Sequence, residues 1–148
     1  MQTCELPDYN PPDEEIVNIL KNVKTIAIVG ISEKPDRDSH QVARYLKEHG
    51  YKIIPVNPKY EQVLGEKCYP DLKSIPEPVD VVDIFRKPEA IPPIVDDAIS
   101  IGAKVVWMQL GLAHNESAEK ARKAGLEVVM SKCIKIEHGK FLRNQTGQ

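Results

Sequence analysis

Short apolar runs alternate with longer amphipathic stretches along the whole chain. Five runs rich in Val and Ile predict strands buried on both faces; they lie at residues 25–30, 52–56, 79–85, 104–108 and 126–130. Between these runs, apolar positions recur at helical spacing. Strands that alternate with helices predict a doubly wound (Rossmann-like) α/β fold, with a parallel five-stranded sheet in three α/β/α layers.

Helix boundaries are predicted from capping residues, glycines and prolines. Asp13 is expected to cap a first helix, and Asp38 with Gln41 to form a capping box for the second, which Gly50 ends. Two further helices are expected at residues 88–101 and 117–124. In the first of these, Pro92 and Pro93 must lie in the first turn or break the helix.

One domain is expected from 148 residues with 41% hydrophobic content. We divide the chain into residues 1–22 (a loose arm of about ten residues, then a helix), 23–138 (the ligand-binding domain) and 139–148 (a tail).

Composition narrows the functional classes. The 20 basic and 22 acidic residues are mixed along the chain, which argues against nucleic-acid binding. No apolar run is long enough to cross a membrane, and the acidic, proline-rich N-terminus is unlike a signal peptide. We therefore expect a cytoplasmic protein.

The ligand site is expected beyond the carboxyl ends of the strands, where the strand order reverses. With the strand order 3-2-1-4-5 that is usual for this fold, the crevice would lie between the strands that end near Gly30 and Met108. The segments that follow the strands are polar and basic, and they read GISEKPDRDSH, NPKY, RKPEA and QLGLAH.

The first of these loops lacks the GxGxxG fingerprint of dinucleotide sites. A phosphate can still bind at the helix N-terminus that follows it. Gly30 is expected to let the backbone approach that phosphate, so that a Cβ at this position would block the ligand. Side chains expected to add hydrogen bonds or charge are Ser32, Lys34, Arg37 and Ser39.

The second loop favours a phosphorylated ribose. An NAD site usually ends its second strand with an acidic residue, whereas this strand ends Val56-Asn57-Pro58-Lys59. A cation in place of the carboxylate suits NADP or the 3′-phosphate of coenzyme A (CoA).

The segments GISEKPDRDSHQVARYLKEHGYKIIPVNP, VDVVDIFRKPEAIP, KVVWMQLG and VVMSKCIKIEH resemble the small stand-alone CoA-binding proteins. These are similar to the N-terminal CoA-binding domain of the succinyl-CoA synthetase α subunit. The resemblance implies that CoA or an acyl-CoA lies across the strand ends, with its nucleotide near the first two loops and its pantetheine arm beside the fourth strand. The expected binding residues are Gly30, Ile31, Ser32, Lys34, Arg37, Ser39, Val56, Asn57, Pro58, Lys59, Phe85, Arg86, Ile91, Gln109 and Gly111.

Catalytic residues are not evident, and we expect a binder rather than an enzyme. The synthetase transfers phosphate through a histidine in a second domain, for which 148 residues leave no room. The chain's own histidines lack an evident nucleophile or carboxylate partner, and surface or capping roles are expected for His40, His49, His114 and His138. Metal-ligand spacings, a GxSxG elbow and a Walker lysine are absent from the sequence.

Three readings stay open: a CoA or acyl-CoA binder, an NADP-type binder or reductase subunit, and a ligand-free interaction module. The acyl group, and whether the chain forms a homo-oligomer or joins an enzyme partner subunit, are also left open.

The cysteines Cys4, Cys68 and Cys133 are too widely spaced for a zinc site and are expected to be ordinary thiols. Cys133 differs in following the fifth strand, between Lys132 and Lys135, which favour a thiolate. A mixed disulfide with CoA is one hypothesis for Cys133, and packing of the last strand is the other.

Overall fold

A computed structural model describes residues 5–145 of the chain. Its centre is a parallel sheet of five strands in the order β2-β1-β5-β6-β7. The strands are β1 (Thr25–Val29), β2 (Lys52–Val56), β5 (Val81–Ile84), β6 (Val105–Met108) and β7 (Glu127–Val129). All five lie inside the runs predicted from the apolar pattern.

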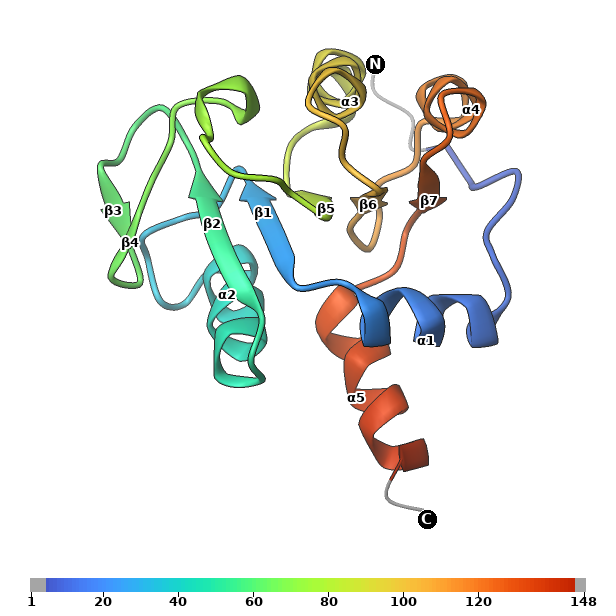
Figure 1. Cartoon of the computed structure of the whole chain (residues 1–148), viewed down its shortest axis with the longest axis horizontal. Coiled ribbons are helices and arrows are strands. Elements are labelled where there is room, and N and C mark those ends of the chain that lie inside the picture. Colours follow the sequence, from blue (N-terminus) through green and yellow to red (C-terminus); the bar gives the residue numbers. More distant parts are fainter. Residues whose placement is uncertain (1–4, 146–148) are drawn as a thin grey trace.

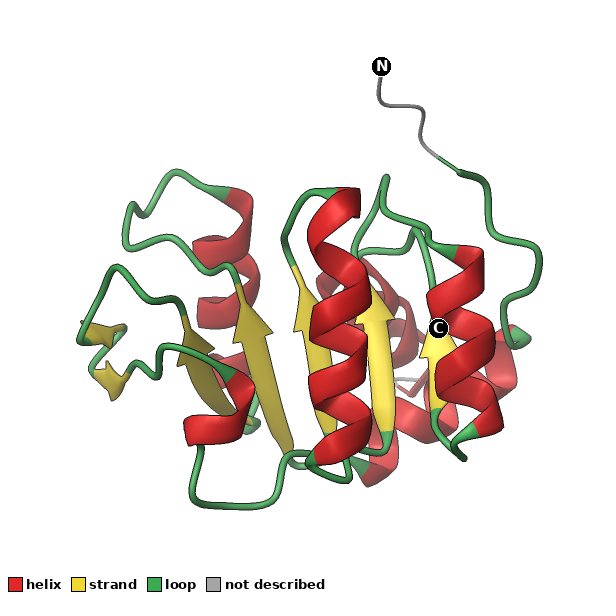
Figure 2. Cartoon of the chain, turned by 90° about the horizontal axis from the view of Figure 1, so that it is seen from above, coloured by secondary structure: helices red, strands yellow, loops and turns green. Residues whose placement is uncertain are grey.

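Helices cover both faces of the sheet, so the three-layer architecture is confirmed (Figures 1 and 2). One face carries α3 (Ile91–Ser100) and α4 (Asn115–Lys123), and the other carries α1 (Asp13–Asn22), α2 (Asp38–Glu48) and α5 (Ile134–Gln145). Each layer has its own apolar core, because side chains in a strand point alternately to opposite faces. The largest buried side chain, Trp107, lies in the core under α1, α2 and α5.

The expected strand order is wrong. In chain order the sheet runs 2-1-3-4-5, not 3-2-1-4-5, because the third strand, β5, pairs with β1. Both orders satisfy the rules for parallel crossovers, so the apolar pattern alone does not distinguish them. The reversal of strand order therefore lies between β1 and β5, and not between the strands that end near Gly30 and Met108.

The segment between β2 and β5, to which the sequence pattern assigned no element, is ordered. It contains a short hairpin of β3 (Gln62–Val63) and β4 (Glu66–Lys67), followed by the 3-10 helix η1 (Leu72–Ser74). A second 3-10 turn, η2 (Pro88–Ala90), precedes α3. The helix predicted from residue 88 is therefore divided, and its prolines fall in the first turn of α3, which is one of the two expected outcomes.

The described part of the arm is not loose. Both polar atoms of the Asn10 side chain bond to the backbone of Met130, each at 2.8 Å, and so extend the exposed edge of the sheet beyond β7. Asp8 N donates to Asn115 Oδ1 at 2.8 Å, which ties the arm to the start of α4.

The expected tail belongs to α5, which runs through the boundary placed at residue 138. Its sequence, IKIEHGKFLRNQ, contains a central glycine and no clean apolar stripe, which is why periodicity missed it. Ile134 and His138 are nevertheless buried.

The two predicted side-chain caps are also absent. Asp13 and Asp38 are the first residues of α1 and α2, and the residues before them, Pro12 and Arg37, make no capping bond through their side chains. Gln41 Nε2 donates instead to Pro35 O at 3.4 Å. No helix among the described residues is long and apolar enough to span a membrane.

Candidate functional site

The carboxyl ends of β1 and β5 define the place where a ligand is expected. From β1 the chain crosses to α2 on one face of the sheet, and from β5 it crosses to α3 on the opposite face (Figure 1). Open parallel sheets bind ligands at such a reversal.

Three neighbouring hollows cross this edge from one face of the sheet to the other. The outer hollow, of about 240 Å³, lies between the ends of β1 and β2 and helix α3. The middle hollow, of about 590 Å³, is shallow and shares Arg86 with the outer one. The inner hollow, of about 360 Å³, lies beside α2 and α5 and shares Phe85 and Leu112 with the middle one. Because neighbouring hollows share lining residues, the three hollows form one continuous groove.

Gly30 allows the groove to form. Its φ is +89°, and a Cβ built on it would lie 2.3 Å from Phe85 O and 2.7 Å from Arg86 Cδ. Only glycine fits there, because the loops after β1 and β5 touch at this residue. The sequence analysis expected a Cβ to obstruct the ligand, but the first obstacle is the protein's own backbone.

The loop after β1 is held in one conformation by its serines. Ser32 N donates to Ser39 Oγ at 2.9 Å, and Lys34 N donates to Ser32 Oγ at 3.1 Å. The buried ring of His40 donates from Nδ1 to Ser32 O at 2.9 Å. These bonds fix the loop beside the N-terminus of α2, whose first N–H groups lack helical partners.

Asn57 joins the second loop to the first. Its Nδ2 donates to Ile31 O at 2.9 Å, and its Oδ1 accepts from Lys59 N at 2.9 Å. Both polar ends of the Asn57 side chain are therefore used inside the chain. The residue positions Lys59 and leaves the lysine side chain available for a ligand.

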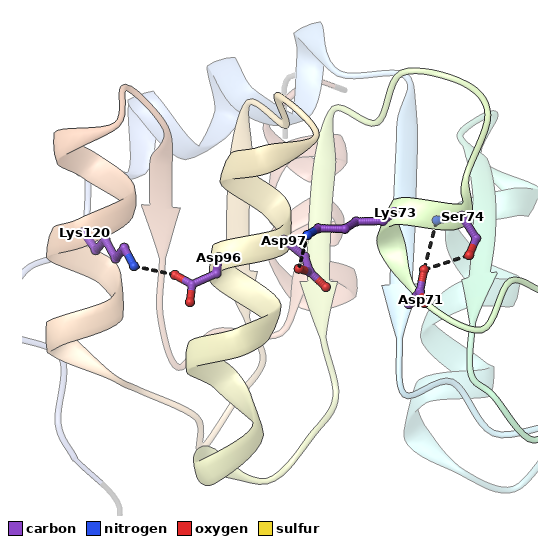
Figure 3. Close-up of polar contacts among 6 residues, drawn as sticks. All are labelled: Asp71, Lys73, Ser74, Asp96, Asp97 and Lys120. Carbon is purple, nitrogen blue, oxygen red and sulfur yellow. Dashed lines mark hydrogen bonds and ion pairs between the residues drawn. The ribbon is translucent and has the colours of Figure 1, made fainter.

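The wall of the outer hollow is braced by polar contacts that the sequence analysis did not identify (Figure 3). Asp71 Oδ1 accepts from Ser74 N at 2.9 Å and from Ser74 Oγ at 2.8 Å, which closes η1. Lys73 then reaches Asp97 of α3 at 3.7 Å. Because Leu72 lies between these anchors, it is held against the hollow.

The inner hollow has both apolar and polar walls, and its polar lining includes Asp38, Gln41 and Lys135. Val42, Phe85 and Leu112 supply part of the apolar lining, and Gln109 and Cys133 supply an amide and a thiol.

Cations gather at the same edge without partners. They follow β1, β2 and β5, and none of the five has an ion-pair partner among the described residues: Lys34, Arg37, Lys59, Arg86 and Lys87. Cations without an ion-pair partner beside free helix N–H groups are suited to an anion.

The predicted binding residues divide into three groups. Those that line the groove are Gly30, Val56, Pro58, Phe85, Arg86 and Gln109. Those around it, in loops or in the first turn of α2, are Ser32, Lys34, Arg37, Ser39, Asn57, Lys59 and Gly111. The side chains of Ile31 and Ile91 are fully buried in the two cores, so they do not form its wall.

Pro93 and Ile94 line the groove where Ile91 was expected to do so, because the helical turn directs Ile91 towards the sheet. The groove also contains residues that the sequence analysis missed, among them Val42, Leu110, Leu112 and Ile136 in the inner hollow and Pro70 and Leu72 in the outer one. The sequence contains little indication that these residues line a groove. Some lie in segments for which no helix or strand was predicted, and the others lie in segments predicted only as a helix face or a loop.

The histidines serve the fold. His114 caps α4 by accepting from Ser117 N at 3.2 Å, as expected, but His40 and His138 are buried rather than on the surface. His138 Nδ1 lies 2.9 Å from Tyr45 Oη, and burial, followed by the charge of His49, lowers the pKa of His138. Within residues 5–143, no cluster of three or more His, Cys, Asp or Glu side chains could hold a metal ion.

These features define a class of protein: a Rossmann-like domain with a groove across the carboxyl ends of its strands. Residues 24–139 match the CoA binding domain family, and the chain belongs to this family. The resemblance inferred from the sequence is thereby confirmed.

Small and large relatives both match. The uncharacterized protein YneT of Bacillus subtilis is 41% identical over 129 residues, which cover 87% of this chain and 96% of YneT. A hypothetical protein from Pyrococcus horikoshii OT3 superposes with a TM-score of 0.88 at 47% identity, covering 96% of this chain and 99% of that one. The ADP-forming acetate–CoA ligase I of Archaeoglobus fulgidus is 26% identical over 133 residues; the match covers 83% of this chain but only 19% of the ligase.

Proposed function

We propose that this protein binds CoA or an acyl-CoA in the groove without transforming it. One observation carries the proposal: cations without ion-pair partners lie beside three joined hollows, at the edge of the sheet where the strand order reverses. Membership of the CoA binding domain family supports this ligand class.

The groove suits the parts of CoA in order. The outer hollow is lined by Pro58, Leu72, Pro93 and Ile94, which offer a dry slot for a planar base. A pyrophosphate attached to a nucleotide in this slot would lie beside Arg86 and beside the loop that follows β1. The middle hollow leads an extended arm past Phe85 to the inner hollow.

Lys59 is assigned to the 3′-phosphate of the ribose. Its backbone is fixed by Asn57 at the end of β2, and its side chain has no ion-pair partner among residues 5–143. A single charge-assisted contact contributes roughly 1.5–3 kcal/mol, which corresponds to about tenfold or more in Kd.

The activity of the ligase relatives is not part of the proposal. The match spans only 19% of the Archaeoglobus enzyme, and the described residues show no nucleophile with an adjacent base in the groove. Binding alone is the function that the site supports.

Isothermal titration calorimetry in the presence of a phosphine reductant tests the proposal. CoA is expected to bind, dephospho-CoA to bind at least about tenfold more weakly, and NADP and NAD to bind little or not at all. Lys59→Ala should lower CoA affinity to that of dephospho-CoA, with Lys123→Ala on α4 as the matched control. Absence of CoA binding would refute the function, equal Kd values for CoA and dephospho-CoA would refute the role of Lys59, and preference for NADP would favour the dinucleotide reading.

A further inference from the structure

Cys133 lines the inner hollow, at the end of the groove beside α2 and α5. It is partly exposed and immediately precedes α5. Cys68, by contrast, is 6% exposed, and its Sγ donates to Asn57 O at 3.4 Å. Cys4 lies outside the described residues. Of the thiols that the structure describes, Cys133 is the one that faces the groove.

The backbone places Cys133 at the N-terminus of α5. Cys133 O accepts from Glu137 N at 3.0 Å, so Cys133 occupies the capping position of α5. The next N–H, from Ile134, donates to Gln109 Oε1 at 3.2 Å. The N–H groups of Lys135 and Ile136 have no partner within the helix. A thiol at a helix N-terminus is one of the environments in which cysteines become reactive.

Gln109 gives an independent sign of a ligand. Its side chain is 5% exposed and lines the same hollow. Its Oε1 is occupied by Ile134 N, but its Nε2 has no hydrogen-bond partner among the described residues. Nε2 is not among the fully enclosed polar atoms that lack a partner, so this donor is open to the hollow, and a carbonyl of a bound molecule can accept a hydrogen bond from it. The pantetheine arm of CoA contains two amide carbonyls.

Apolar side chains form part of the wall beside Cys133. Val42, Phe85 and Leu112 are apolar, and Leu110 and Ile136 flank the opening with 67% and 50% exposure. The strand spacing of about 4.8 Å puts β7 roughly 14 Å from β1 along the edge. An extended phosphopantetheine arm is long enough to span this distance.

We propose that Cys133 captures the thiol end of CoA as a mixed disulfide, with Gln109 Nε2 holding a carbonyl of the arm. The inference rests on the proposed function, because the nucleotide must first occupy the groove. The Cys133 thiolate attacks one sulfur of CoA disulfide; the bond between the two CoA sulfurs breaks, and a bond between Cys133 Sγ and one CoA sulfur forms. The other CoA leaves as a thiolate and takes a proton from water. The co-reactant is therefore the disulfide of the ligand itself, and no other oxidant is needed.

Intact-mass spectrometry with peptide mapping tests the proposal. The full chain is treated with CoA disulfide, glutathione disulfide or cystamine, and the rate of adduct formation on each cysteine is measured. Addition of one CoA at Cys133 is expected, at least tenfold faster than either other adduct and lost in Cys133→Ser but kept in Cys68→Ser and Cys4→Ser. Desulfo-CoA, which fills the groove without a thiol, should slow the reaction at least tenfold.

The outcomes separate this inference from the proposed function. CoA binding by calorimetry without an adduct at Cys133 overturns the disulfide step alone. Equal rates with all three disulfides, or no protection by desulfo-CoA, show an ordinary accessible thiol and also overturn it. Gln109→Glu keeps the acceptor for Ile134 N but replaces the amide donor with a carboxylate. It should slow CoA addition without changing the rate for cystamine, and an unchanged CoA rate would remove Gln109 from the proposal.

Discussion

The two edges of the central sheet differ in whether their charges are satisfied within the chain. At the amino edge, Asp80 accepts from Lys24 N at 2.8 Å and Thr25 N at 3.1 Å and pairs with Lys104 at 3.6 Å. Lys52 at the same edge pairs with Glu77. At the carboxyl edge, five cations lack such partners, and three hollows lie among them.

This contrast separates residues for stability from residues for binding. Charged groups with internal partners contribute to folding and need no ligand. Cations without internal partners are hydrated in the free protein. They can form charge-assisted hydrogen bonds with an anion when one binds. Substitutions at the amino edge should therefore change the free energy of unfolding, and substitutions at the carboxyl edge should change ligand affinity.

The largest effect is expected at the one carboxyl-edge residue that is essential to the fold. Gly30→Val adds a Cβ 2.3 Å from Phe85 O at a φ of +89°, and should lower the free energy of unfolding by roughly 3 kcal/mol or more. Gly111→Ala is the matched control, because Gly111 has a φ of +88° but open space around its Cα; it should cost only about 1 kcal/mol. Urea denaturation compares the two. Equal losses would show that φ, and not the contact between the loops, requires glycine at residue 30.

The second effect concerns the amino edge. Asp80→Ala leaves two backbone N–H groups without acceptors and should cost about 2 kcal/mol, with the Kd for CoA unchanged. Burial acts to raise the pKa of Asp80, but the bonds from Lys24 and Thr25 and the charge of Lys104 outweigh it and lower the pKa below its ordinary value. Because the folded-state pKa is depressed, this stabilisation is fully present above the unfolded pKa and is lost as pH falls through the folded one. The gap between wild type and variant should therefore shrink in acid, and a gap independent of pH would contradict the role of the charge.

The fold was largely predictable because each strand has a continuous apolar signal. All five strands of the central sheet and four of the five described α-helices follow from periodicity and from glycine and proline positions. Strand order was not predictable in this way, because it depends on which strands pair and not on the pattern within any one strand. Helix α5 was missed because Gly139 interrupts a weak stripe, and tertiary packing of Ile134 and His138 supplies what the local pattern lacks.

The candidate site was predictable where it follows directly from strand ends. Gly30, Arg86 and Gln109 come one residue after β1, two after β5 and one after β6, so knowing the strands placed them at the edge. The walls were not predictable, because Leu72 and Ile136 reach the groove through η1 and α5, which the sequence pattern did not reveal. Ile91 shows the opposite error, since proximity to a strand end does not say which side of a helix faces the sheet.

The third effect returns to the carboxyl edge. Arg86 lines both the outer and the middle hollow and has no ion-pair partner among residues 5–143. Arg86→Ala should raise the Kd for CoA about tenfold, equivalent to about 1.5 kcal/mol, with little change in unfolding midpoint. Lys104→Ala, at the amino edge, is the matched control and should leave the Kd unchanged. Calorimetry with both variants measures the contrast, and similar Kd values for the two would place Arg86 outside the site.

The smallest effect tests a charge that belongs to neither edge. Asp83 lies in the middle of β5 between Ile28 and Trp107 and is fully buried, and both of its carboxylate oxygens lack a hydrogen-bond partner among the described residues. Burial raises the pKa of Asp83 well above its ordinary value, so the folded chain holds this group as a neutral acid. Above about pH 4 the unfolded state releases the Asp83 proton, whereas the folded state keeps it. The free energy of unfolding therefore falls as pH rises from about 4 towards the pKa of Asp83 in the folded state. Asp83→Asn keeps the shape without the proton and should be more stable than wild type by about 1 kcal/mol at neutral pH. Urea denaturation of both proteins between pH 4 and 8 should show this advantage growing with pH, with no change in CoA affinity. A constant difference across that range would mean that Asp83 does not carry the proton.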